Sequence, residues 1–152
     1  DVCSSDLVVM PLVGTMSKQQ EHVYAAEASI SHGQTFNSIE AAQRFADQVT
    51  STKWWTDAYP EIVRLEVTKF SSASCSCARP DIEKGVGQVF LAAGMLNVMT
   101  LLHEAAHCVV PKGVGHEATW VRAYLKIVYQ TLGSDMYLDL YNAFKIHNVD
   151  VG

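Results

Sequence analysis

The stretch from Met95 to Val110 reads MLNVMTLLHEAAHCVV, and it decides how the rest of the chain is interpreted. Apolar side chains lie on every side of it over a length that exceeds an ordinary strand, so it predicts a buried helix, ended by the proline and glycine that follow. Apart from the thiol of Cys108, its ionisable side chains are His103, Glu104 and His107. Burying two imidazoles and a carboxylate among leucine, alanine and valine costs several kcal/mol unless a partner compensates them. This helix therefore needs such a partner.

These three residues form the pattern H-E-x-x-H, and a metal ion is the partner that explains them. Imidazoles one helical turn apart project from the same face, so the ring nitrogens of His103 and His107 can converge on one cation. Glu104 lies beside them and can hold a metal-bound water without ligating the metal. This arrangement predicts Zn²⁺ as the cofactor, His103 and His107 as ligands and Glu104 as the catalytic general base. The alternative is a pair of histidines satisfied within the core.

A catalytic zinc site needs a third protein ligand, and His116 is the leading candidate. It follows a turn with two glycines, 111–115, and stands at the start of the next predicted helix, so it can face back toward the first two histidines. The weaker candidates are three carboxylates, Glu117, Asp135 and Asp139. The alternative for His116 is an exposed loop histidine.

Helical periodicity, capping residues and glycine stops predict further helices over about 17–31, 38–49, 117–132 and 134–147. Alternating apolar side chains predict a strand around 63–68, and flanking glycines bound a second strand over 85–92. The small, polar stretch 71–80, which contains Cys75 and Cys77, is interpreted as a loop. The fold class is therefore α+β, with several helices packed on a short sheet.

The length of 152 residues predicts one domain, which we place at 16–152. The segment 1–15 is interpreted as a non-native or untranslated extension, because residues 1–7 resemble the translation of a sequencing adapter. Ser17 and Gln20 form a capping box just after Met16, which favours a start there, with Met10 as the alternative.

Charge and hydropathy limit the classes of partner that this chain is expected to bind. The net charge is -5 and the 11 Lys and Arg residues are scattered, so no nucleic-acid partner is expected. The most apolar stretch is too short and too polar to span a bilayer, and no secretory signal is visible, so we expect no membrane partner and a cytoplasmic location. The sequence does not predict the oligomeric state.

Two segments carry a resemblance to known proteins. His103-Glu104-Ala105-Ala106-His107, followed by Gly115-His116-Glu117-Ala118-Thr119-Trp120, resembles the small zincins related to SprT-like and minigluzincin metallopeptidases. The likeness extends over 16–152 to a family of metallohydrolases from actinobacteria and their phages, through Val23-Tyr24-Ala25-Ala26-Glu27 and the terminal helix. The resemblance implies a zincin-like fold in which the strand 86–92 forms the edge of a small sheet and pairs with an extended peptide.

The expected function is that of a zinc metallopeptidase acting on a peptide or protein substrate. The alternatives are a zinc hydrolase of a non-peptide amide and a zinc-stabilised binding module without catalysis. The candidates for a hydrogen-bond donor to the transition state are Tyr129, Tyr137 and Tyr141, and the sequence does not distinguish among them. Trp120 and Cys108 are interpreted as core residues.

Overall fold

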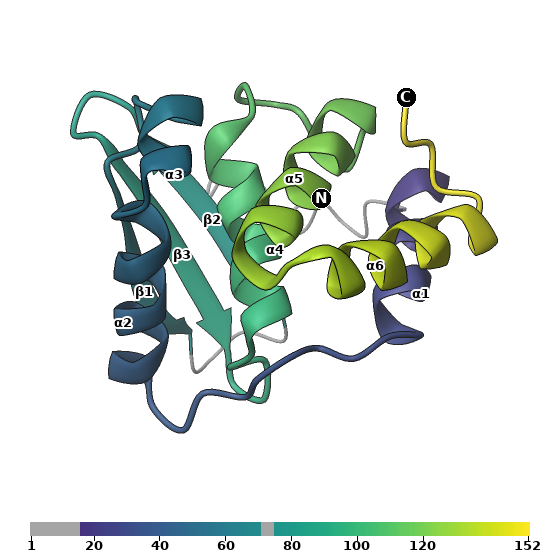
Figure 1. Ribbon diagram of the computed structural model, residues 1–152, viewed down its shortest axis with the longest axis horizontal. Helices are drawn as coiled ribbons and strands as arrows, with labels where there is room; N and C mark the ends of the chain where they lie inside the picture. Colours follow the sequence, from purple (N-terminus) through teal and green to yellow (C-terminus); the bar gives the residue numbers. More distant parts are fainter. Residues whose placement is uncertain (1–15, 71–74) are drawn as a thin grey trace.

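A computed structural model describes residues 16–70 and 75–152, and in these ranges it shows six helices and one sheet of three strands (Figure 1). The α+β class is therefore confirmed, whereas the extension assigned to 1–15 lies outside the described residues. So do residues 71–74 of the segment interpreted as a loop. The elements in chain order are α1 (Lys18–Ala28), α2 (Ile39–Thr50), α3 (Lys53–Ala58), β1 (Arg64–Phe70), β2 (Cys77–Asp81), β3 (Val86–Ala92), α4 (Val98–Val109), α5 (Ala118–Leu132) and α6 (Ser134–Ile146).

Side-chain caps fix where two of the helices that build the site begin. Ser17 accepts a hydrogen bond from the backbone N–H of Gln20 at 3.1 Å at the start of α1, as the capping box predicts. Asn97 accepts one from the N–H of Thr100 at 2.8 Å, so α4 begins at Val98 rather than at Met95. No helix in the described ranges combines the length and apolar character needed to cross a membrane.

The sheet corrects one expectation. Its strand order is β1-β3-β2, with β1 parallel and β2 antiparallel to β3, so the strand 86–92 is central and the prediction that it forms an edge is wrong. The reason is β2: the small, polar stretch 71–80 is predicted to be a loop, but Cys77–Asp81 form a short strand despite Pro80. Its residues nevertheless pair with β3 from Cys77 opposite Phe90 to Asp81 opposite Val86.

The helices form layers around this sheet. α2 lies along β1, α4 packs on β2 and β3, and α5, α6 and α1 follow in turn beyond α4 (Figure 1). Gly87 lets α4 approach β3 closely, because a Cβ atom there would lie 2.8 Å from the Cys108 sulfur and 2.8 Å from a Leu65 methyl group. Cys108 is buried at this contact, as expected, and burial raises the pKa of its thiol.

α3 is a short helix that the sequence patterns did not reveal. It buries Trp55, whose indole N–H donates to the carbonyl of Ile62 at 2.7 Å. Just before it, α2 covers the outer edge of β1. The Gln43 side chain there donates to the carbonyl of Leu65 and accepts from the N–H of Val67, each at 2.7 Å.

Candidate metal centre

Three histidine side chains meet between α4 and the start of α5. His103 and His107 project from the same face of α4, and the turn that ends this helix brings His116 back against them. The Nε2 atom of His116 lies 3.0 Å from Nε2 of His103 and 3.3 Å from Nε2 of His107. The structure thus brings together the three histidines that the sequence singled out.

This spacing suits a metal ion. Zinc–nitrogen bonds of about 2.0–2.1 Å at tetrahedral angles place two ligand nitrogens about 3.3 Å apart. The two Nε2–Nε2 distances of 3.0 and 3.3 Å match this value closely, and the candidate ligand atoms of all three histidines lie within 4.8 Å of one another. Within the described part of the chain, no other group of three His, Cys, Asp or Glu side chains has metal-binding spacing. Three imidazoles can bind zinc, copper, iron or nickel, so the geometry defines a candidate metal site without naming the metal.

Trp120 forms the floor of this site. Its ring centroid lies 4.6 Å from that of His103, 5.0 Å from that of His107 and 4.5 Å from that of His116. Trp120 is fully buried, as the sequence predicts for a core residue. Because its indole contacts all three imidazoles, it also limits how far they can rotate away from a shared centre.

Glu27 provides a partner for His103 that sequence reasoning did not identify. Its Oε1 atom lies 2.8 Å from Nδ1 of His103, which links the last turn of α1 to α4. The carboxylate accepts this hydrogen bond from the Nδ1–H group, so the Nε2 atom of a neutral His103 presents its lone pair toward the other histidines. Burial raises the pKa of the nearby Tyr124 hydroxyl, with a further contribution from Glu27, and this hydroxyl donates to the carbonyl of Met99 at 3.3 Å.

Burial keeps two of the imidazoles uncharged. It lowers the pKa of His107 to about 2 and that of His116 to about 3, in each case with help from the neighbouring His103. Burial also lowers the pKa of His103, but Glu27 and Glu104 more than offset it and the net change is upward. Neutral imidazoles are the form that binds metals, so His107 and His116 are ready to do so at any moderate pH.

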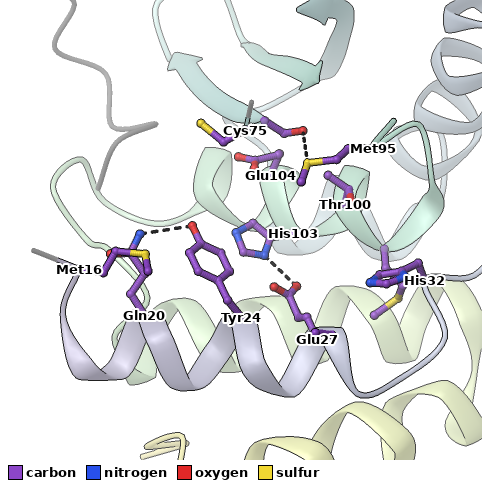
Figure 2. A pocket seen from close by; sticks show the side chains of 13 residues that line it. Met16, Gln20, Tyr24, Glu27, His32, Cys75, Met95, Thr100, His103 and Glu104 are labelled. Carbon is purple, nitrogen blue, oxygen red and sulfur yellow. Dashed lines mark hydrogen bonds and ion pairs between the residues drawn. The ribbon is translucent and has the colours of Figure 1, made fainter. Parts of the chain in front are cut away.

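Glu104 lies next to the histidines without joining the metal cluster. It is 5% exposed, and this burial raises the pKa of its carboxyl to about 7. Glu104 and His103 line a cavity of about 450 Å³, which Figure 2 shows between α1, α4 and the chain that leads into β2. A water or a substrate in this cavity can therefore reach the carboxylate.

Tyr24 is a second residue to which the sequence patterns gave no role, although it belongs to the stretch 23–27 that carries part of the family resemblance. Its ring stacks on His103 with a centroid distance of 6.1 Å and meets His116 edge-on at 5.3 Å. Its hydroxyl accepts a hydrogen bond from the Gln20 side chain at 3.2 Å, and the residue lines the same cavity (Figure 2). Local patterns do not signal Tyr24, because its place beside the histidines depends on how α1 packs against α4.

The remaining candidates lie elsewhere. Asp135 and Asp139 are exposed on α6, and Glu117 is exposed at the N-cap of α5, so none of the three joins the histidine cluster. The three tyrosines considered as transition-state donors line a different cavity, between α5 and α6. They are Tyr129, Tyr137 and Tyr141, and the structure does not place them with Glu104.

Comparisons with known protein families, with curated proteins and with solved structures found no match for this chain. The case for a function therefore depends on the geometry of His103, His107, His116 and Glu104 and on the cavity beside them.

Proposed function

We propose that this protein is a zinc-dependent metallopeptidase. The observation that carries the proposal is the convergence of three imidazole Nε2 atoms beside a buried carboxylate, Glu104, that is not itself part of the metal cluster. His103, His107 and His116 would hold the ion. A zinc ion bound there supplies Lewis-acid chemistry, which polarises a carbonyl group and lowers the pKa of a water molecule.

Glu104 acts as the general base in this proposal. Its carboxylate accepts a proton from the attacking water and then delivers it to the amine that leaves. A pKa of about 7, raised by burial, lies near a neutral working pH, so the same group is effective in both directions. A purely structural metal site has no need of such a carboxylate.

Tyr24 replaces the more distant tyrosines as the proposed hydrogen-bond donor. Burial raises the pKa of its hydroxyl, with further contributions from the nearby carboxylates Glu104 and Glu27, so the hydroxyl stays protonated at neutral pH. The hydrogen bond from Gln20 holds the oxygen in place and leaves its proton free for an acceptor. We assign this proton to the oxygen on which negative charge develops when the carbonyl is attacked.

The antiparallel strand β2 is the proposed binding edge for an extended peptide. Among residues 16–70 and 75–152, β2 pairs with β3 on one side only, whereas the outer edge of β1 is already hydrogen-bonded by Gln43. Ser76, just before β2, lines the cavity together with Glu104. A peptide that adds to β2 therefore runs toward the general base.

The proposal is tested by incubating the zinc-loaded full chain with a peptide library and with unfolded proteins, followed by mass spectrometry of the products. The wild type is expected to cleave peptide bonds. Glu104→Gln should retain zinc and lose activity by about a hundredfold to ten thousandfold, and the exposed control Glu83→Gln should cleave like the wild type. If the zinc-loaded wild type cleaves nothing, or Glu104→Gln cleaves at the same rate, the proposal is wrong.

A further inference from the structure

The wall of the cavity beside Glu104 is rich in methionine. Met16, Met95 and Met99 line it together with Tyr24 and Ala28. Figure 2 labels Met16, Met95 and Tyr24 among these residues. Three of the five methionines of the chain thus gather around one cavity. Its volume of about 450 Å³ is in the range of ligand pockets, about 300–1,000 Å³, so it has room for a large side chain.

The chemistry of this wall favours an uncharged, apolar occupant. Methionine side chains are flexible and polarisable, so they adapt to aliphatic and aromatic groups of different shapes. An acidic side chain would lose its hydration and meet the carboxylates of Glu27 and Glu104. A basic side chain would find Glu27 already bonded to His103 and Glu104 assigned, in the proposed function, to the attacking water. Other titratable side chains of the wall include Tyr24, His103 and the exposed His32.

The cavity is also continuous with the site, because His103 and Glu104 are part of its wall. A side chain seated among the methionines therefore belongs to a residue next to the bond that Glu104 would act on. We propose that the cavity is a specificity pocket for a large apolar side chain, such as that of Leu, Met or Phe, at a position adjacent to the scissile bond. The assignment of the occupant to a substrate rests on the proposed function, whereas the binding preference of the cavity does not.

This preference is measured without zinc and without catalysis. The full chain is labelled with ¹³C at the methionine methyl groups and titrated with N-acetyl-phenylalaninamide, N-acetyl-leucinamide, N-acetyl-aspartamide or N-acetyl-lysinamide. The signals of Met16, Met95 and Met99 are expected to shift with the phenylalanine and leucine probes, which should bind at least about tenfold more tightly than the charged probes. Met136, on α6, does not line the cavity, so its signal is expected to stay in place.

A pair of variants on α1 locates the binding. Ala28 is exposed and lines the cavity, so Ala28→Trp fills the space from the surface with little risk to folding. Ala25 is exposed on the same helix but does not line the cavity, which makes Ala25→Trp the matched control. Ala28→Trp is expected to abolish the methionine shifts, and Ala25→Trp to leave them unchanged.

The results separate this inference from the proposed function. Equal or tighter binding of a charged probe, no shift of the three methionines, or equal effects of the two tryptophan variants would overturn the specificity pocket, even if the zinc-loaded enzyme cleaves peptides. If the apolar probes bind as expected while the zinc-loaded enzyme cleaves nothing, the cavity binds apolar side chains and the peptidase proposal fails.

Discussion

The carboxylate of Glu27, on α1, lies 2.8 Å from Nδ1 of His103, on α4, although 76 positions separate them in the chain. This contact fixes the ring nitrogen that His103 can offer to a metal, and it does so from a helix outside the H-E-x-x-H segment. Carboxylate partners of this kind hold metal-ligating histidines in position and raise their basicity. The candidate metal centre therefore depends on the position of α1 as well as on α4 and α5.

Replacing Glu27 tests this dependence. Glu27→Gln removes the charge while its amide oxygen can still accept from Nδ1, and Glu27→Ala removes the acceptor as well. Loss of such a partner typically weakens metal binding by about 10-fold to 100-fold, and we expect alanine to have the larger effect. Zinc affinity is measured by competition with a chelator. Glu21→Gln, at an exposed position of the same helix, is the control and should bind zinc like the wild type. Wild-type affinity in both Glu27 variants would show that the contact is not needed.

His116 is the ligand with the least local signal in the sequence, so its role needs its own test. His116→Ala should bind zinc far more weakly than the wild type, because two histidines remain where a stable site needs three. Its neighbour variant Glu117→Ala and the α6 variant Asp135→Ala should retain full affinity, since both side chains are exposed and outside the cluster. If a carboxylate variant loses zinc affinity and His116→Ala keeps it, the third ligand is misassigned.

The metal-free protein should become less stable as the pH falls below about 6.5, the ordinary pKa of histidine. Below this pH the unfolded chain binds protons on His107 and His116, whose folded pKa values are about 2 and 3, and the folded chain does not. Between about pH 6.5 and about pH 4.5, Glu104 acts in the opposite direction. Burial raises its folded pKa to about 7, so it holds a proton in the folded state and not in the unfolded state, which offsets one of the two histidine protons. His103 is protonated in both states here, because its folded pKa is raised.

The free energy of unfolding should therefore fall more steeply with decreasing pH below about pH 4.5, where Glu104 is protonated in both states. Each extra proton bound by the unfolded state removes about 1.4 kcal/mol of stability per pH unit. Urea unfolding with EDTA, repeated across this range, measures the slope. A double variant with His107→Asn and His116→Asn should have a flatter curve than the wild type. Identical slopes would contradict the assignment of the acid sensitivity to these two histidines.

The close contact between β3 and α4 predicts a stability effect at Gly87. Gly87→Ala places a Cβ atom 2.8 Å from the Cys108 sulfur and 2.8 Å from Leu65, so either α4 or the strand must shift. Overpacking of this kind costs about 1–3 kcal/mol. Gly115→Ala is the control, because a Cβ atom there has no neighbour within 4 Å. The two variants are compared by chemical denaturation, and equal free energies of unfolding would show that the helix has room to move.

Local patterns predicted much of this fold because its helices are locally encoded. Ser17 and Ser38 cap α1 and α2, and a glycine follows α5, where Gly133 has a positive φ of 91°. The convergence of the three histidines was predictable for the same reason. Helical spacing places His103 and His107 on one face, and a short turn connects them to His116.

The errors concern contacts between distant segments. β2 contains Pro80 and has no apolar alternation, so its pairing with β3 depends on the sheet rather than on its own residues. Missing β2 left β3 at the wrong place in the strand order. Glu27 and Tyr24 belong to the stretch 23–27 that carries part of the family resemblance, but local helical patterns give neither a role. Only the position of α1 in the fold brings them to His103.

The proposed function requires that His103, His107 and His116 bind one zinc ion through imidazole nitrogen. X-ray absorption spectroscopy at the zinc edge, on the chain loaded with one equivalent of zinc, reports these ligands. We expect three imidazole nitrogens at about 2.0–2.1 Å, with the fourth position taken by a water oxygen. A first shell that contains sulfur at about 2.3 Å, or only carboxylate and water oxygens, would contradict it.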